Sequence, residues 1–287
     1  MKALVPNTGV DAEYIARFIQ SSSPKILHWV RATTADNFPL DELEGLKVPL
    51  PTLVEQQRIA KELEQSDHLR RIRRHAVEVC DDFRLNSFRE ELLKCNAELI
   101  PLDEICLKIT DGVHVTPTYI KIGVPFLRVT DIQDQEVDWS QVKRISRDEY
   151  NEITRRTKPE LGDVLYSKNG TIGIAKEITW REPFAHFVSL ALVKPDRERI
   201  NPTYLTAWLN TPDALRQATS HSKTLTVTNL HLNEIEKMWI PLPSIPDQKE
   251  LVGLVTNGNH LRATHVEALR QADHLFQTLL HQSFSPQ

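Results

Sequence analysis

The chain has 287 residues, 40% of them hydrophobic, and this length allows about two domains with buried cores. Its 35 basic and 39 acidic residues give a net charge of −4, which excludes a global positive field for nucleic acid or an anionic membrane. Three cysteines without a C-x-x-C pair argue against a disulfide scaffold or a zinc site and favour a reduced, cytoplasmic protein. No apolar leader and no run of about 18 apolar residues is present, so we expect neither a secretory signal nor a membrane span.

The beginning of the chain recurs 192 positions later. Residues 34–51 align with residues 226–243 at this constant offset, and residues 10–19 resemble residues 200–209 after a slip of two positions. Proline-leucine turns before helices are common, but such a turn does not explain agreement over about 80 residues. The identical pairs include Asn37 and Asn229, Leu40 and Leu232, Glu42 and Glu234, Glu44 and Glu236, Pro49 and Pro241, Leu50 and Leu242, Pro51 and Pro243, and Gln56 and Gln248.

Each copy of the repeat predicts a long helix after a P-L-P segment, because proline fixes an extended approach and Glu55 or Asp247 adds negative charge to a first turn. The helices are predicted over residues 51–94 and 245–281. A helix of this length needs a partner, so we expect the two to pair, parallel or antiparallel, as a coiled coil. Apolar spacing of three and four predicts the seam of the first helix at Leu69, Ile72, Ala76, Val79 and Phe83. Leu261, Ala268 and Leu275, seven residues apart at the positions equivalent to Leu69, Ala76 and Phe83, predict the same seam in the second helix.

Four arginines in the first helix, Arg70, Arg71, Arg73 and Arg74, are expected on its solvated faces, with phosphate contact as the alternative. Between the helices, residues 100–230 contain short β-branched or aromatic runs broken by Gly, Pro, Asn and Asp. Strands are predicted over 124–132, 163–168, 172–178 and 185–195, and helices over 147–156 and 202–209. The expected fold class is α+β: a globular mixed α/β domain plus two long helices pairing as a coiled coil.

In the order of its parts, the chain resembles the specificity subunits of type I restriction-modification systems. The resemblance rests on P-L-P-x-x-x-x-Q before each long helix and on ITDGVHVTPTYI, VPFLRVTDI, LGDVLYSKNGTIGIA and HFVSLALVKP, which are similar to segments of that family's target-recognition domain. It implies a remnant of a first recognition domain at 1–50, a spacer helix at 51–95, a complete recognition domain at 96–243 and a second spacer at 244–287. Because the family has an entire domain before the first spacer, we expect either a truncated or half-type subunit that pairs with a second copy, or a first segment that completes its domain with another chain.

The resemblance also implies that polar loop residues read base edges, while Lys and Arg hold phosphates. A stretch from Lys143 to Lys158 has six basic and three acidic residues, which favours phosphate contact, with a salt-bridged helix face as the alternative. Asp-Gly and Asn-Gly are equally hairpin-turn signals, and His114 could be an ordinary loop residue. The candidate DNA-binding residues are Asp111, His114, Thr116, Arg128, Thr130, Lys143, Arg144, Ser167, Lys168, Asn169, Thr171, Ser222, Lys223, Thr224 and Thr226.

A non-catalytic role in host defence follows from the resemblance. The chain has no G-x-G-x-x-G after a strand, no H-E-x-x-H and no N-P-P-aromatic tetrapeptide. Methylation and cleavage are expected in methyltransferase and motor-nuclease partner subunits, with S-adenosylmethionine bound in the methyltransferase and no cofactor or metal in this chain. The other expected partners are double-stranded DNA and a second copy of the chain.

Exposed positions of the two helices are the candidate surface for the methyltransferase. The alternative function is an adaptor or competitor that binds methyltransferase subunits without reading DNA. The balance of 17 basic and 17 acidic residues between positions 100 and 230 leaves this alternative open.

Overall fold

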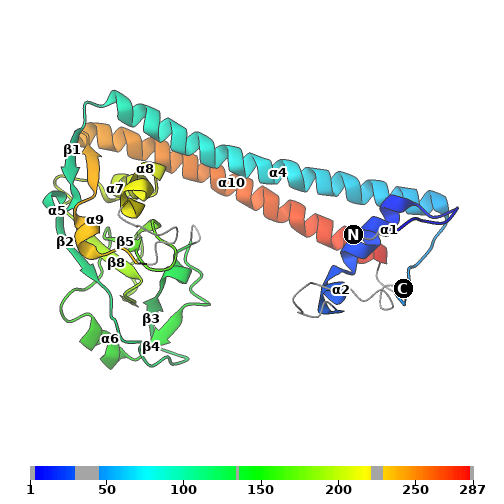
Figure 1. Cartoon of the computed structure of the whole chain (residues 1–287), viewed down its shortest axis with the longest axis horizontal. Helices are drawn as coiled ribbons and strands as arrows, with labels where there is room; N and C mark the ends of the chain where they lie inside the picture. The colour runs from blue at the N-terminus through cyan, green and yellow to red at the C-terminus, as the bar shows by residue number, and fades with distance from the viewer. Residues whose placement is uncertain (1–3, 30–44, 134–135, 221–228, 285–287) are drawn as a thin grey trace. The chain divides into compact units, whose positions relative to one another are not determined.

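A computed structural model describes residues 4–29, 45–133, 136–220 and 229–284 of the chain. The chain divides into two compact units: unit 1 comprises residues 1–83 and 258–287, and unit 2 comprises residues 84–257. Both boundaries fall inside the long helices α4 (Leu53–Lys94) and α10 (Ile245–Phe284), which are cyan and orange to red in Figure 1. Among the described residues, no helix combines the length and the apolar character needed to cross a membrane.

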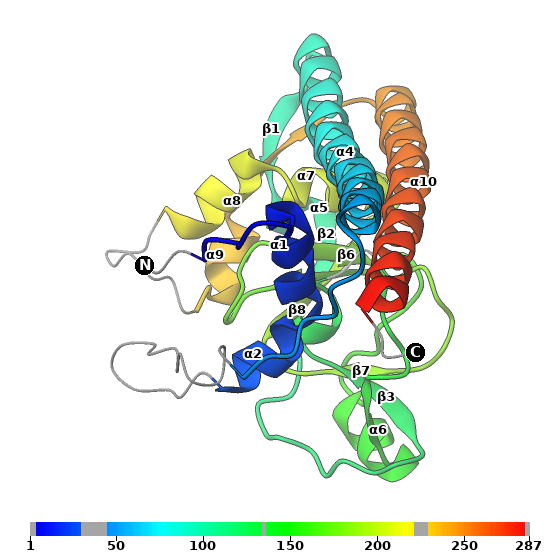
Figure 2. The same ribbon diagram turned by 90° about the vertical axis from the view of Figure 1, so that its right-hand side faces the viewer.

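The described part of unit 1 contains α1 (Ala12–Ser21), α2 (Ser23–Trp29), the beginning of α4 and the end of α10, and α1 packs with both long helices. Asp11 begins α1, because its carboxylate accepts a hydrogen bond from the Tyr14 amide at 2.9 Å. In unit 1, α4 and α10 lie side by side and antiparallel (Figures 1 and 2). Their apolar cluster contains Tyr14, Ile59, Ala60, Leu63, Phe276 and Leu280.

The buried face of each long helix differs from the predicted seam. Six of the predicted seam residues are between 37% and 64% exposed: Leu69, Ile72, Val79, Phe83, Leu261 and Leu275. Ala76 and Ala268 are half-buried. The buried or half-buried positions lie one residue later, at Arg70, Arg73, Val77, Cys80 and Arg84 in α4 and at Arg262, Leu269 and Phe276 in α10. The prediction was therefore wrong at six of its eight positions, and the buried face lies one residue later in both helices.

Basic side chains on the buried face explain this error, since the prediction followed apolar residues alone. The Arg70 guanidinium lies 4.3 Å from the ring centre of Phe276, and its Nε is 3.6 Å from Asp273 Oδ1. Arg262 Nε donates to Asp81 Oδ1 at 2.7 Å. The two ion pairs are equivalent, because Arg262 and Asp273 follow Arg70 and Asp81 by 192 positions. Long basic side chains can pack their stems in a helix contact while their charges remain paired.

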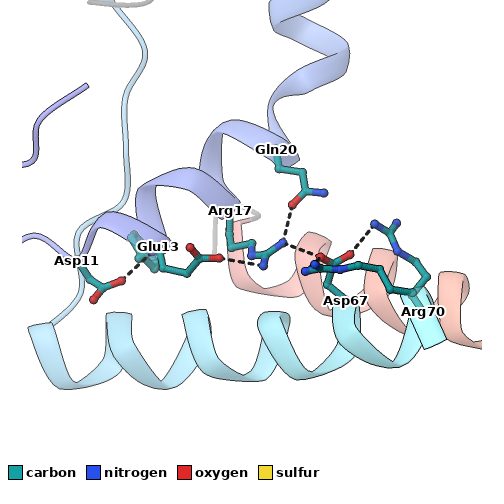
Figure 3. Close-up of polar contacts among 8 residues, drawn as sticks. Asp11, Glu13, Arg17, Gln20, Asp67 and Arg70 are labelled. Atoms are coloured by element: carbon teal, nitrogen blue, oxygen red, sulfur yellow. Dashed lines mark hydrogen bonds and ion pairs between the residues drawn. The ribbon is translucent and has the colours of Figure 1, made fainter. Parts of the chain in front are cut away.

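A buried charge network attaches α1 to α4 in unit 1 (Figure 3). Arg17 Nη1 lies 3.4 Å from Asp67 Oδ2, and Arg17 also pairs with Glu13 at 2.8 Å. Asp67 accepts hydrogen bonds at 2.7 Å from both Arg70 and Arg71. Burial alone would raise the pKa of Asp67, but these arginines more than offset it, so the pKa lies below its usual value. The expectation of solvated arginines is therefore wrong for Arg70, whereas Arg71 and Arg74 are exposed.

In its described residues, unit 2 contains three sheets. The largest has the strand order β2-β8-β5-β6 with antiparallel neighbours, the second has the order β4-β3-β7, and β1 pairs with β9 alone. Its elements are β1 (Glu98–Pro101), α5 (Leu102–Ile105), β2 (Cys106–Asp111), β3 (Val124–Leu127), η1 (Val129–Asp131), β4 (Lys143–Ile145), α6 (Arg147–Ile153), β5 (Val164–Ser167), β6 (Ala175–Glu177), β7 (Ala185–His186), β8 (Leu190–Pro195), α7 (Pro202–Leu209), α8 (Pro212–Thr219), α9 (Leu232–Glu236) and β9 (Trp239–Leu242).

The main core of unit 2 lies between the large sheet and the helices α7, α8 and α9. Val164, Tyr166 and Val193 of the sheet pack with Tyr204 and Trp208 of α7. The end of α4 and the beginning of α10 join this core through Phe88, Leu251 and Val255. Within unit 2, β3, β4 and α6 lie at the end opposite to these helix segments (Figures 1 and 2).

The mixed fold and the two long helices confirm the predicted fold class. The predicted helix over 202–209 is α7, and the helix predicted over 147–156 is α6, which ends at Ile153. The predicted strand over 124–132 extends only to Leu127, because a 3₁₀ turn follows. The strands β1, β2, β4 and β9 were not predicted, and their pairing is with partners distant in sequence except for β4.

Candidate nucleic-acid interface

Three loops of unit 2 converge, and they carry most of the predicted DNA-binding residues. They follow β2, β3 and β5. Asp111 Oδ1 at the end of β2 lies 3.2 Å from Lys168 Nζ after β5, and Asp111 Oδ2 lies 3.6 Å from His114 Nε2. Thus the segments TDGVH and SKNG, which are more than 50 positions apart, meet at one place.

Two residues that the sequence analysis did not select hold these loops together. Ser189 Oγ accepts from the Val129 amide at 3.3 Å, while its carbonyl accepts from the Lys168 amide at 2.9 Å. Gln133 Nε2 donates to Thr171 Oγ1 at 3.2 Å. Ser189 stood inside a predicted strand, and Gln133 directly follows another, so only their position beside loop residues could have signalled this role.

Glycine makes two of these loops sterically possible. Gly170 has φ +76°, the left-handed region that favours glycine, as expected for a tight turn at Asn169-Gly170. At Gly112, a Cβ atom would collide with the His186 carbonyl. The hairpin alternative for Asp111-Gly112 is wrong, because β2 pairs with β8 and the backbone after it passes against β7.

Accessibility divides the candidate residues. His114 has 71% of its side chain exposed, and Thr116, Thr130, Lys143 and Thr171 are exposed as well. Ser167 is fully buried, with its Oγ accepting from the Ile174 amide at 2.8 Å, so its prediction as a DNA contact is wrong.

Lys168 and Arg128 are both paired within the chain. Lys168 is buried against Asp111. Arg128 binds both carboxylate oxygens of Asp131, at 3.1 and 2.9 Å, and these hydrogen bonds raise the pKa of its guanidinium. Both side chains therefore support the loop conformation in this structure.

The predicted phosphate-binding stretch begins in β4. Lys143 is exposed, while Arg144 Nη1 donates to the Gly123 carbonyl at 3.1 Å. Within the described part of the chain, no ion pair within 4 Å joins Arg147, Arg155 or Arg156 to an acidic side chain. Glu149 instead accepts from the Thr118 amide at 3.1 Å. The alternative of a salt-bridged helix face therefore lacks support.

A neutral histidine lies beneath the converging loops. His186 of β7 is buried, and burial lowers its pKa to about 4. Its carbonyl accepts from the Val113 amide at 3.1 Å, in the loop that also carries His114. The two histidines therefore differ: His114 faces solvent and His186 is an uncharged part of the core.

Ser222, Lys223, Thr224 and Thr226 lie outside the described residues. The chain that follows them returns to the same loops, because Asn229 pairs with Asn169 and the Leu230 amide donates to the Lys168 carbonyl at 2.8 Å. Within the described ranges, no group of three or more His, Cys, Asp or Glu residues could hold a metal ion.

Comparison with known proteins shows similarity to one class of protein. Residues 1–77 match the Type I restriction modification DNA specificity domain. Two solved structures share the fold. One is a type I restriction-modification S subunit from M. genitalium, with TM-score 0.59 and 15% identity, over 97% of this chain and 74% of that chain. The other comes from a structural study of complex assembly and conformational transition of the type I R-M system, with TM-score 0.58 and 20% identity, over 96% and 71%.

Two particular relatives carry the same designation. The chain is 26% identical to the EcoBI specificity subunit of Escherichia coli over 95% of this chain, and 23% identical to the putative MjaX specificity subunit of Methanocaldococcus jannaschii over 61%. It spans 65% of the length of the first and 43% of the second. These findings confirm the resemblance to type I restriction-modification specificity subunits that the sequence indicated.

Proposed function

We propose that the chain is the DNA sequence-recognition subunit of a type I restriction-modification complex. It reads a DNA half-site through residues 96–243, and the helical segments 51–95 and 244–287 act as spacers. The observation that carries the proposal is the convergence of three polar loops in a chain similar to specificity subunits. Asp111 and Lys168 join the loops after β2 and β5, and the contacts of Ser189 and Gln133 add the loop after β3. Such loops present several donors and acceptors together, which reading base edges requires.

The exposed loop side chains His114, Thr116, Thr130 and Thr171 are the proposed base readers, together with Asn169. Ser222, Lys223, Thr224 and Thr226 complete this proposed set, since the residues that follow them, Asn229 and Leu230, contact Asn169 and Lys168. The proposed phosphate contacts are Lys143 and the exposed residues Arg147, Arg155 and Arg156, because exposed cations bind phosphate regardless of sequence. Asp111, Lys168, Arg128 and Arg144 hold the loops in place.

We propose that methyltransferase subunits dock on the exposed apolar face of the helices in unit 1. This face comprises Leu69, Ile72, Val79, Phe83, Leu261 and Leu275. Leu69 and Leu261 are equivalent positions of the sequence repeat. Two antiparallel helices are exchanged by a twofold axis perpendicular to the plane that contains both, and such a rotation keeps equivalent residues on the same side of that plane. Large apolar side chains exposed in a row are typical of a protein contact.

Catalysis belongs to other subunits in this proposal. The methyltransferase supplies S-adenosylmethionine and methylation, a motor-nuclease subunit supplies cleavage, and the assembly works in the cytoplasm. A second copy of the chain would supply a second recognition domain. The alternative, an adaptor that binds methyltransferase without reading DNA, is favoured only by the even charge balance of residues 100–230.

Selection from randomised DNA duplexes, with and without the methyltransferase subunits, tests the proposal. We expect the complex to enrich a defined base pattern, which His114→Ala combined with Thr130→Ala changes. Lys143→Ala is the matched control: it should weaken binding to all duplexes and reduce the salt dependence by about one phosphate contact. A complex that assembles but enriches no base pattern would exclude DNA reading and favour the adaptor.

The docking face has a separate test. Phe83→Ser combined with Ile72→Ser should reduce co-purification of the methyltransferase subunits, whereas Glu64→Ser, an exposed change on the same helix, should not. Equal retention by the two variants would rule out docking on this face.

A further inference from the structure

A glutamine in the first turn of each long helix is buried and binds only backbone groups. Gln56 of α4 is 2% exposed and Gln248 of α10 is 0% exposed. Both follow a P-L-P segment by five positions. A buried primary amide is costly unless all its polar atoms find partners, so its retention in both copies requires a specific arrangement of neighbours.

In unit 2, the Gln248 amide joins three segments. Its Nε2 donates to the Pro243 carbonyl at 2.9 Å and to the Arg199 carbonyl at 3.0 Å, and its Oε1 accepts from the Asn201 amide at 2.7 Å. Pro243 belongs to the P-L-P segment, while Arg199 and Asn201 lie directly before α7. The Tyr204 hydroxyl of α7 donates to the Pro241 carbonyl at 2.6 Å, which adds a second link between α7 and the P-L-P segment. These contacts among the P-L-P segment, the start of α7 and the first turn of α10 are called the junction.

Unit 1 repeats this arrangement at equivalent positions. Gln56 Nε2 donates to the Pro51 carbonyl at 2.9 Å and to the Gly9 carbonyl at 3.4 Å, and Oε1 accepts from the Asp11 amide at 2.9 Å. The Tyr14 hydroxyl of α1 donates to the Pro49 carbonyl at 2.7 Å. Because only backbone groups of the neighbours are used, Gly9 can stand where the other copy has Arg199.

Glutamine suits this position by both chemistry and length. Its amide presents two donors and an acceptor at the end of a side chain that reaches across the first turn. Glutamate would turn a carboxylate oxygen toward two carbonyl oxygens, and methionine would fill the space without any hydrogen bond. The bonds tie the first turn of the helix to the P-L-P segment and to the preceding helix at once, which restricts the direction in which the long helix leaves.

We propose that Gln56 and Gln248 are positioning residues that fix the exit direction of each long helix. For Gln248, this sets the direction of α10 from the domain that carries the converging loops. This inference rests on the proposed function, in which a spacer helix must hold a recognition domain at a defined angle on DNA.

The exit direction in unit 2 can be measured by electron paramagnetic resonance on spin labels at Glu152→Cys in α6 and Thr256→Cys in α10. The three native cysteines are replaced by alanine in all samples. We expect Gln248→Met and Gln248→Glu to broaden the distance distribution between the labels. Gln56→Met, the same change in unit 1, and Lys249→Met, its exposed neighbour, should leave it unchanged. An unchanged distribution in the Gln248 variants would overturn the inference.

The role in DNA reading is tested on duplexes selected by the wild-type complex. Gln248→Met should keep the preferred bases but accept a wider range of separations between half-sites, while a merely weakened fold would reduce binding at every separation alike. If Gln248→Met does not fold, Gln248→Asn, which shortens the reach by one methylene group, serves in both measurements. A wild-type complex that selects no bases defeats the proposed function, and the label distances then decide the positioning role alone.

Discussion

Unit 1 and unit 2 each contain one copy of the repeated junction, and the copies agree in hydrogen bonding but differ in charge. Gln56 and Gln248 bind equivalent backbone groups, and Tyr14 and Tyr204 donate to equivalent proline carbonyls. The charge network of Arg17 and Asp67 has no counterpart in the second copy, because the equivalent positions are Ala207 and Asn259.

The surroundings of the two preceding helices explain the difference. In unit 2, α7 packs against a sheet and a large apolar cluster. In the described part of unit 1, α1 has a small apolar cluster around Tyr14 and Leu63. Where little apolar area is buried, paired charges can supply specificity of docking that a core supplies elsewhere. The hydrogen bonds of Gln56 and Gln248 to backbone groups are thus common to both copies of the junction, whereas the Arg17–Asp67 charge network is an addition in the first copy.

The largest expected effect concerns the faces of α4. Leu63→Ala should destabilise unit 1 by about 3 to 4 kcal/mol, because Leu63 is fully buried, whereas Leu69→Ala should cost below about 0.5 kcal/mol. Chemical denaturation followed by hydrogen exchange of unit 1 peptides measures both. Similar losses of unfolding free energy in the two variants would support the seam predicted from the sequence and contradict the observed helix face.

Removal of the Asp67 carboxylate should lower the stability of unit 1 but not that of unit 2. Asp67→Ala leaves the buried Arg17 guanidinium without its partner on α4 and should destabilise unit 1 by about 3 kcal/mol. Arg71→Ala, which removes an exposed partner of the same carboxylate, should cost about 1 kcal/mol or less. Hydrogen exchange of unit 2 peptides should stay unchanged in both variants, and a matching loss there would mean that the network is not confined to unit 1.

As pH decreases, the stability of unit 2 should fall at a higher pH than the stability of unit 1. The pKa of His186 is lowered from 6.5 to about 4, so in this window the unfolded chain binds a proton that folded unit 2 does not. The stability of unit 2 should therefore fall by about 2 to 3 kcal/mol as pH decreases from 6.5 to 4.

Asp67 titrates lower. Its pKa lies below 3.8, so its contribution to unit 1 is present above that pH and is lost as pH falls through the folded-state pKa. Urea denaturation from pH 7 to 4, read by hydrogen exchange of each unit, measures the difference. His186→Asn should flatten the profile of unit 2, and a parallel decline of both units would contradict the assignment.

The smallest expected effect concerns the tyrosine hydrogen bond that both copies of the repeat contain, from Tyr14 to Pro49 and from Tyr204 to Pro241. Burial raises the pKa of the Tyr14 and Tyr204 hydroxyls, so both remain donors at neutral pH. Tyr14→Phe and Tyr204→Phe should each cost about 1 kcal/mol in their own unit. A clear inequality between the two losses would show that the junctions are equivalent in geometry but not in energy.

The sequence alone could predict elements that depend on local signals. The long helices were predicted because proline begins them and no glycine or proline interrupts the first, and α7 because Pro202 and Asn201 mark its start. The strands β1 and β9 could not be predicted, since each has four residues and pairs with a segment about 140 positions away. The helix faces were misjudged because Arg70 and Arg262 occupy half-buried positions in the helix contact, which a prediction from apolar spacing ignores.

For the candidate site, sequence segments predicted the right loops but not the role of each side chain. Asp111, His114 and Lys168 do meet, yet the burial of Ser167 and Lys168 depends on the strands and loops beside them. Whether a polar side chain faces solvent or satisfies a neighbouring amide is decided by tertiary contacts, which residue type and spacing do not contain.

The pairing of β1 with β9 has a consequence for the history of the chain. Glu98 lies opposite Leu242 and Pro101 opposite Trp239, so the globular part begins and ends on two adjacent strands. A domain whose ends are neighbours can be inserted or exchanged as a block, because any replacement needs only two strands at the same separation. Recombination between related genes within the codons for these strands would transfer a whole domain and leave both helices in frame.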